Sequence, residues 1–218
     1  MNTPHTPYQA FLFDMDGTLL TSIAAAERVW TRWAHQHGLD AESFVPTIHG
    51  ARAVDTIAKL QLPGVDPVAE AAWITREEIA DVQGVTAIAG APDFLRQLPP
   101  ERWAIVTSAP AALAARRLQA AGFIPPPILV SADDVVHGKP DPSGYLLAAQ
   151  RLGVAINQCL IFEDAGVGIQ AAEAAGASVL VITATHTHSL ATRHACVTDF
   201  QALRPRHGPG GITLDGVP

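Results

Sequence analysis

The chain has few of the residues that would mark a secreted, nucleic-acid-binding or metal-thiolate protein. Of its 218 residues only two are cysteines, Cys159 and Cys196, and neither forms a metal-ligand pattern with the other. Lys and Arg number 14 against 21 Asp and Glu, which gives a net charge of −7 with no basic cluster. This charge offers no electrostatic footprint for nucleic acid or for an anionic membrane surface.

Long apolar runs are also missing. No stretch reaches the roughly 20 residues that a transmembrane helix needs. The start of the chain, MNTPHTPYQA, has neither the basic segment nor the apolar segment of a secretory signal. We therefore expect a cytoplasmic, reduced monomer with no nucleic-acid or membrane partner. At this length it can hold one sizeable core, or a core with a small inserted domain.

Apolar segments that alternate with Ala-rich segments predict an α/β fold. The expected strands are short and almost wholly apolar: Tyr8–Asp14, Trp103–Thr107, Ile128–Val130, Cys159–Glu163 and Ser178–Thr183. The expected helices between the later strands are Pro110–Ala121, Pro142–Leu152 and Ala165–Ala175. Such alternation is typical of a Rossmann-like parallel sheet with right-handed crossovers.

One long helical stretch interrupts this alternation. Between Leu20 and Trp103 the pattern predicts helices over Ala24–His37, Ala51–Leu62 and Pro67–Val82, with a shorter piece near Glu42–Val45. We expect residues 19–87 to form a small α-helical cap, and residues 1–18 with 88–218 to form the Rossmann-like core. The Gly- and Pro-rich end, RHGPGGITLDGVP, is expected to be irregular or an edge strand.

Two carboxylates follow the first strand directly. In FLFDMDGTLL, Asp14 and Asp16 come at the carboxyl end of a buried strand, where ligands of parallel sheets bind. Side chains two residues apart on extended backbone point the same way, so the two acids can converge. Two close anions favour a hard divalent cation such as Mg²⁺. The alternative is an Asp-Gly turn with no function beyond backbone geometry.

Polar residues also follow the second expected strand and precede a later helix. Thr107 and Ser108 stand before the helix near Pro110, where they could bind an anion or simply cap the helix. Lys139 lies between Gly138 and Pro140, in a rigid turn before the next helix. A lone lysine is usually a solvated surface charge, but a fixed ammonium here could neutralise both an aspartate and a phosphate.

A second pair of carboxylates ends the fourth expected strand. In CLIFEDAGVGI, Glu163 and Asp164 close a strongly apolar run. Asp164 could cap the following helix, or it could complete a cation site begun by Asp14 and Asp16. The sequence alone leaves both open.

Four short patterns in this order resemble the haloacid dehalogenase superfamily. They are D-x-D-G-T at Asp14–Thr18, a strand ending at Thr107–Ser108, G-K-P at Gly138–Pro140 and E-D at Glu163–Asp164. The resemblance runs from about Tyr8 to Phe200, and the helical insertion resembles that family's cap of the first class. ERVWTRWA, IHGARA and AIVTS are further similar to bacterial phosphatases of hexose and hexitol phosphates, and to glycerol-phosphate phosphatases.

The resemblance implies a role for each residue. Asp14 would be the nucleophile of a Mg²⁺-dependent phosphoric monoester hydrolase, and Asp16 its general acid and base. Thr107, Ser108 and Lys139 would bind the phosphoryl oxygens of a small phosphate ester. Asp14, the backbone carbonyl of Asp16, and Asp164 would hold Mg²⁺, with Glu163 a direct or an outer ligand.

The leaving-group pocket is expected in the cap. Its polar candidates are His49 and Arg52, then Glu27 and Arg28, each of which could instead be an ordinary surface or packing residue. Thr21 stands where the family often has Asp, a departure at the cap hinge that bears on substrate choice. Two alternatives stay open: a sugar-phosphate mutase, and a catalytically inactive binding protein.

Overall fold

The computed structural model describes residues 7–188 and 190–217, and its centre is a six-stranded parallel sheet. The strand order is β5-β4-β1-β6-β7-β8. The strands are β1 (Ala10–Phe13), β4 (Trp103–Val106), β5 (Leu129–Val130), β6 (Cys159–Glu163), β7 (Ser178–Ile182) and β8 (Ala195–Val197). The first strand in sequence therefore lies in the middle of the sheet, which confirms the predicted α/β class.

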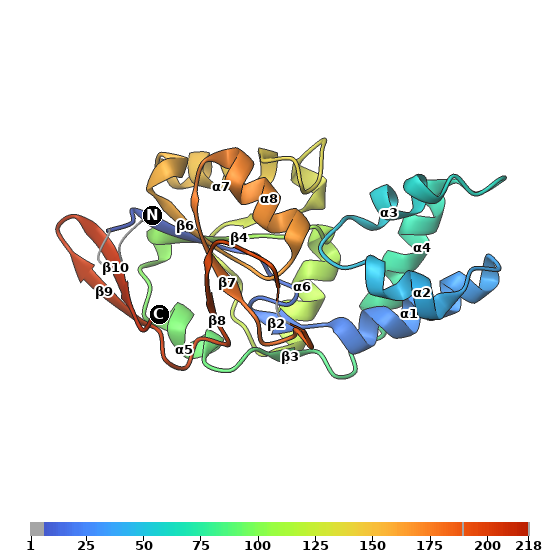
Figure 1. Ribbon diagram of the computed structural model, residues 1–218, viewed down its shortest axis with the longest axis horizontal. Coiled ribbons are helices and arrows are strands. Elements are labelled where there is room, and N and C mark those ends of the chain that lie inside the picture. Colours follow the sequence, from blue (N-terminus) through green and yellow to red (C-terminus); the bar gives the residue numbers. More distant parts are fainter. Residues whose placement is uncertain (1–6, 189, 218) are drawn as a thin grey trace.

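The two faces of the sheet are covered because each central strand is apolar on both sides. Phe11 and Phe13 of β1 point into a cluster of aromatic rings on one face, and the Phe13 and Phe162 rings stack with centroids 4.5 Å apart. Leu12 points to the opposite face, against α7 (Ser143–Leu152) and α8 (Gly166–Ala175). Figure 1 shows these two helices on one side of the sheet and α5 (Ala91–Arg96) on the other.

The predicted strands and helices of the core all occur, with ends shifted by one or two residues. The helix expected at Pro110–Ala121 is α6 (Ala111–Ala120). The sequence reasoning missed α5 and β8, both of which are short. Single 3-10 turns complete the connections: η2 (Pro100–Arg102), η3 (Ala132–Asp134) and η4 (Ile156–Gln158).

Four helices occupy the interval between two very short strands, β2 (Leu20–Thr21) and β3 (Thr86–Ala87), which pair with each other. They are α1 (Ile23–Gln36), α2 (Ala41–Phe44), α3 (Ala53–Leu60) and α4 (Pro67–Ala80), with the turn η1 (Val45–Thr47). These helices have their own apolar cluster, in which the Trp30 and Trp33 rings meet edge to face. Figure 1 shows them together at one end of the molecule.

The C-terminal segment forms a hairpin of its own. Strands β9 (Arg204–Gly208) and β10 (Gly211–Asp215) pair antiparallel and form a separate two-stranded sheet. A single bridge joins Ile212 to Tyr8, next to β1. The expectation of an irregular segment was therefore wrong, while each of the two strands is an edge strand of this small sheet, as the alternative expectation had it. Within the described residues, no helix is long and apolar enough to cross a membrane.

Candidate active site

The residues singled out at the strand ends meet at one edge of the sheet. Asp14 follows β1, Thr107 follows β4, and Glu163 ends β6, so parallel strands deliver all three to the same edge. The amide of Asp14 still donates to the carbonyl of Phe162 at 2.9 Å, which holds Asp14 in line with β6. The loop between η3 and α7 brings Lys139 to the same place.

Lys139 is buried between two carboxylates. Its Nζ lies 2.5 Å from Oδ1 of Asp14 and 2.6 Å from Oε1 of Glu163, and its side chain is 7% exposed. Burial alone would lower the pKa of Lys139, but the two carboxylates outweigh it and raise the pKa well above its ordinary value. The ammonium is therefore a permanent charge beside Asp14, which excludes the ordinary role of a solvated surface lysine.

Glu163 has both of its oxygens engaged by protein donors. Oε1 accepts from Lys139 and, at 2.7 Å, from the hydroxyl of Tyr145. Oε2 accepts from the amides of Asp164 and Ala165 at 2.9 and 3.1 Å. A carboxylate held by four donors orients the lysine and the turn after β6, and it has little capacity left for a metal ion.

Asp14 and Asp164 face each other with few compensating donors. With Glu163 they form a cluster whose ligand atoms lie within 4.8 Å of one another. Oδ2 of Asp14 is buried without a hydrogen-bond partner among the described residues. Burial raises the pKa of Asp14 to about 7 despite Lys139, and burial together with Asp14 raises the pKa of Asp164 well above its ordinary value.

These features fit a bound cation. A buried carboxylate oxygen without a donor, next to a second, half-buried carboxylate, is what a hard divalent ion satisfies. Gly17, at a φ of 95°, keeps the space beside Asp164 open, since any side chain there would overlap that carboxylate. The donor set is all oxygen, so the cluster could hold an ion such as Mg²⁺ or Ca²⁺.

Asp16 turns away from that cluster toward the inserted helices. Its Oδ1 accepts from the hydroxyl of Ser22 at 2.6 Å and from Arg117 at 3.1 Å. Arg117, on α6, also pairs with Glu78 of α4 at 3.1 Å. Sequence reasoning missed Arg117 and Glu78, because an arginine and a glutamate within helices ordinarily lie on the surface.

Thr107 and Ser108 begin the turn into α6. Oγ1 of Thr107 accepts from the amide of Ala109 at 3.1 Å, a local turn contact. The N-cap of α6 is Pro110 with no side-chain hydrogen bond, so neither Thr107 nor Ser108 caps that helix. The hydroxyl of Ser108 donates to the carbonyl of Gly50 at 2.9 Å, and so connects the core to the loop before α3. Both residues line the cavity that also contains Asp14.

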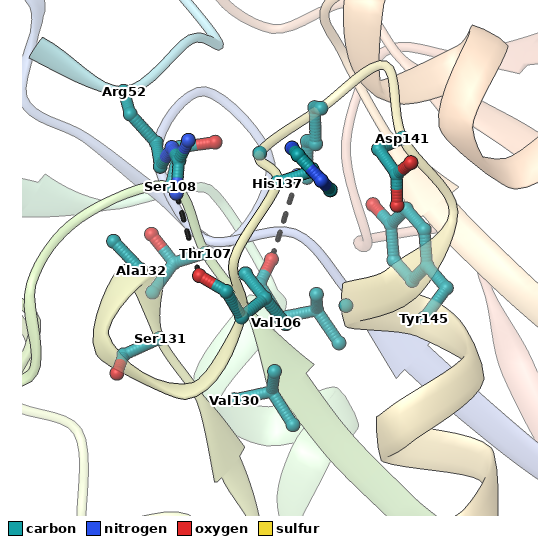
Figure 2. Close-up of a pocket in the computed structure, with 14 residues that line it drawn as sticks. Arg52, Val106, Thr107, Ser108, Val130, Ser131, Ala132, His137, Asp141 and Tyr145 are labelled. Atoms are coloured by element: carbon teal, nitrogen blue, oxygen red, sulfur yellow. Dashed lines mark hydrogen bonds between the residues drawn. The ribbon is translucent and has the colours of Figure 1, made fainter. Parts of the chain in front are cut away.

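Arg52 joins α3 to the loop that carries Lys139. Its guanidinium pairs with Asp55 at 2.6 Å and donates to the carbonyl of Val136 at 3.0 Å. It also lies against Gly138, where a side chain would overlap it. Figure 2 shows Arg52 on one side of a small pocket, with Asp141 and Tyr145 on the other. Through these contacts Arg52 connects the inserted helices to the loop that carries Lys139.

His49 and Glu27 form a looser pair at the entrance. The ring Nε2 of His49 lies 3.7 Å from Oε1 of Glu27, and both side chains are more than a third exposed. Arg28, the fourth cap candidate, points instead at Asp81 in a two-pronged pair of 2.7 and 2.8 Å. Of the four candidates, His49 lines the cavity above Asp14 and Arg28 does not.

A cavity of about 90 Å³ lies between the core and the inserted helices. Its floor contains Asp14 and Asp16, and its roof contains Trp30, His49 and Glu78. A small molecule in this cavity would contact the carboxylates of the core and the polar residues of the roof together. This geometry suits chemistry on a small, polar, anionic compound.

A family model described as haloacid dehalogenase-like hydrolase matches residues 8–176. Curated relatives include hexitol phosphatase A of Escherichia coli (strain K12), 39% identical over 81% of this chain and 83% of the relative. Validoxylamine A 7'-phosphate phosphatase of Streptomyces hygroscopicus subsp. limoneus is 34% identical, with 93% and 99% covered. Fructose-1-phosphate phosphatase of Escherichia coli (strain K12) is 33% identical, with 78% and 93% covered.

Solved structures share the fold. A hydrolase from Pseudomonas syringae superposes with a TM-score of 0.70 and 27% identity, covering 81% of this chain and 85% of that one. A β-phosphoglucomutase from Clostridium difficile gives a TM-score of 0.70 at 20% identity, covering 80% and 84%, and so is similar in fold alone. The curated relatives agree with the predicted enzyme class, a phosphoric monoester hydrolase.

Proposed function

Because the chain belongs to the haloacid dehalogenase-like hydrolases, as its sequence predicted, we propose that it is a Mg²⁺-dependent phosphatase of small sugar or polyol phosphates. The observation that carries this proposal is the pairing of Asp14 with Lys139 opposite Asp164, with Asp16 in the same cavity. We assign the core to residues 1–18 and 88–218 and the cap to residues 19–87.

In this proposal Asp14, the backbone carbonyl of Asp16, and Asp164 would hold the cation. When bound, it would supply positive charge to the phosphoryl group and neutralise the two facing carboxylates. Glu163 is not assigned as a ligand of the cation, because four donors from Lys139, Tyr145 and the turn after β6 already occupy its oxygens. It holds Lys139 against Asp14.

The first chemical step transfers the phosphoryl group to the enzyme. A carboxylate oxygen of Asp14 attacks phosphorus, the bond from phosphorus to the ester oxygen breaks, and an aspartyl phosphate forms. Asp16 gives its proton to the departing alkoxide. Lys139 and the donors after β4 and before α6 stabilise charge on the phosphoryl oxygens.

The second step releases phosphate. Asp16, now ionised, takes a proton from a water molecule as that water attacks the aspartyl phosphate. The bond between phosphorus and Asp14 breaks and both carboxyl groups return to their starting forms. Cap closure over the cavity limits the entry of other water during the first step.

A phosphate-release screen tests the function directly. Purified protein with Mg²⁺ should release phosphate from hexose and hexitol phosphates faster than from nucleotide monophosphates, because its relatives include a hexitol phosphatase and a fructose-1-phosphate phosphatase. Release from no ester at all would overturn the proposal and favour a binding protein. Conversion of a sugar phosphate to its isomer without free phosphate would favour the mutase, which the fold also accommodates.

Substitution of Asp16 by Asn should reduce activity by an amount that depends on how much the leaving group needs a proton. Asn keeps the size of the side chain but cannot donate a carboxylic proton, so kcat/KM for a hexitol phosphate should fall by roughly 10²- to 10⁴-fold. The phenolate of an aryl phosphate leaves without protonation, so kcat/KM for such an ester should fall much less. The ratio of kcat/KM for the two esters checks this, and equal losses would mean that Asp16 serves only in holding the cation.

Substitutions of the two cap candidates, Arg52 and His49, should differ in which substrates they affect. Arg52→Ala loosens the Lys139 loop, so kcat/KM for sugar and aryl phosphates should fall together, by roughly 10- to 100-fold. His49→Ala removes a side chain that lines the cavity without contacting the Lys139 loop, so kcat/KM should fall chiefly for the sugar phosphate. The exposed Arg28→Ala, away from the cavity, is the control. A selective effect of Arg52→Ala would instead place it on the substrate.

A further inference from the structure

A buried guanidinium connects the core to the inserted helices beside the nucleophile. Arg117 lies on α6 and its side chain is 8% exposed. One nitrogen, Nη1, lies 3.1 Å from Oδ1 of Asp16, and the other, Nη2, lies 3.1 Å from Oε1 of Glu78. Glu78 comes from α4 and is equally buried. One planar side chain thus holds two carboxylates from two separate parts of the chain.

The contacts of Asp16 are uneven between its two oxygens. Across residues 7–188 and 190–217, the hydrogen bonds to this carboxylate come from Ser22 and Arg117, and both go to Oδ1. Oδ2 therefore accepts no hydrogen bond from the described residues, and Asp16 lines the cavity that contains Asp14. A guanidinium has donors in a fixed plane, so it fixes the direction of a carboxylate better than a single hydroxyl can.

The pKa values of Glu78 and Arg117 are shifted by their burial and by each other. Burial raises the pKa of Glu78, while Arg117 opposes that change, and the Trp30 side chain also hydrogen-bonds to Glu78. Burial would lower the pKa of Arg117, but Asp16 and Glu78 raise it further above its ordinary value. A permanently charged, buried arginine has a strong preference for keeping both partners. Displacing α4 would leave Arg117 with Asp16 alone.

We propose that Arg117 is a positioning residue, which orients Asp16 for proton transfer and does so fully only while Glu78 of the cap is in place. This proposal rests on the proposed phosphatase function, in which Asp16 carries the proton. Arg117 holds Oδ1 and leaves Oδ2 to face the ester oxygen. Glu78 fixes the other end of the guanidinium, so cap docking and the aim of the proton donor are coupled.

A different role for the same residues makes a different prediction. Arg117 and Glu78 line the cavity, so they could hydrogen-bond to hydroxyls of the leaving group instead. In that case their loss would raise KM for polyol phosphates and spare kcat. A purely structural role would reduce activity on every ester alike, through loss of folded protein. If Arg117 instead positions Asp16, the loss should fall on esters whose leaving group needs a proton.

The test uses Arg117→Lys, which keeps the charge but loses the planar pair of donors, and Glu78→Gln, which keeps the volume but loses the charge. The readout is kcat/KM for a hexitol phosphate and for p-nitrophenyl phosphate, because this quantity reports the step in which the ester oxygen leaves. We expect Arg117→Lys to lose roughly 10- to 100-fold on the hexitol phosphate and under about threefold on the aryl ester. Glu78→Gln should show the same selectivity with a smaller loss.

Two comparisons make the test specific. Arg116→Lys, on the same helix but without an ion pair among the described residues, should leave both esters unchanged. In an Asp16→Asn background, Arg117→Lys should cause no further loss on the hexitol phosphate, because the group that it positions no longer carries a proton. Circular dichroism and thermal unfolding confirm that each variant is folded.

Several outcomes would overturn the proposal while leaving the phosphatase function intact. They are equal losses on both esters, a loss confined to KM, or a full additional loss in the Asp16→Asn background. A wild-type protein that hydrolyses neither ester would refute the phosphatase function instead. Crystal structures give a readout without activity: Asp16 should turn away from its present direction in Arg117→Lys, and an unchanged Asp16 would refute positioning.

Discussion

Replacing Asp14 by Asn should reduce phosphate release by at least about three orders of magnitude, on sugar and aryl phosphates alike. The amide keeps the volume of the carboxylate but is a poor nucleophile, so the aspartyl phosphate cannot form. Asp14 is buried and paired with Lys139 at 2.5 Å, so no neighbouring acid can take its place without moving the lysine. Steady-state phosphate release measures this loss.

The covalent intermediate gives this prediction a second readout. Wild-type protein quenched in acid during turnover should gain the mass of one phosphoryl group on the peptide that contains Asp14, and Asp14→Asn should not. Asp93→Asn, at an exposed carboxylate of α5, is the matched control and should behave as wild type. A mass gain in Asp14→Asn, or activity near that of wild type, would contradict the covalent mechanism.

The residues of the site that could be predicted were those that end strands. Asp14, Thr107, Glu163 and Asp164 each follow an apolar run, and parallel strands place their carboxyl ends at a common edge. Lys139 was predictable from its rigid Gly-Lys-Pro turn. The sequence could assign these residues to one place because the order of strands and helices already determines which edge they share.

The hydrogen-bond partners within the site were not predictable from sequence. Nothing in CLIFEDAG indicates that Glu163 is saturated by Lys139, Tyr145 and two amides. Arg117 stands beside Arg116 in an Ala-rich helix, and only the packing of α6 against the inserted helices buries the one and leaves the other at the surface. Burial of a charged side chain is a property of the tertiary fold.

Short elements were missed for a related reason. Strand β8 has three residues and α5 has six, too few to show a clear period of two or of 3.6. The hairpin β9–β10 contains five Gly and Pro residues within RPRHGPGG, which masked two strands that stabilise each other through pairing. Each of these elements exists because a partner far away, or directly across a turn, completes it.

Removal of divalent cations should abolish turnover, and added Mg²⁺ should restore it. Asp14 and Asp164 face each other in a buried site where Oδ2 of Asp14 has no described hydrogen-bond partner. Without a cation, the two charges repel each other and the phosphoryl group would add a third anion. Ca²⁺ should restore activity poorly, because it favours longer bonds and more ligands than Mg²⁺. Dialysis against EDTA followed by titration with each ion measures this.

The same site should make the stability of the cation-free protein depend on pH. Burial raises the pKa of Asp14 from 3.8 to about 7, so the folded state binds more protons than the unfolded state between these values. The free energy of unfolding should therefore fall as pH rises from about 4 to 7. Mg²⁺ stabilises the ionised form, so it should raise Tm most near pH 7 and flatten this dependence.

Asp164→Asn tests whether these effects come from the proposed site. It removes one oxygen ligand of the proposed cation, so it should weaken both the rise in Tm with Mg²⁺ and the activation by Mg²⁺. Asp93→Asn should keep the wild-type response to the ion. Full activity of thoroughly cation-free protein, or a Tm that Mg²⁺ does not change, would refute the assignment of Asp164. Two facing ionised carboxylates are unfavourable unless a cation or a proton lies between them, and the titration measures how far Mg²⁺ takes that place.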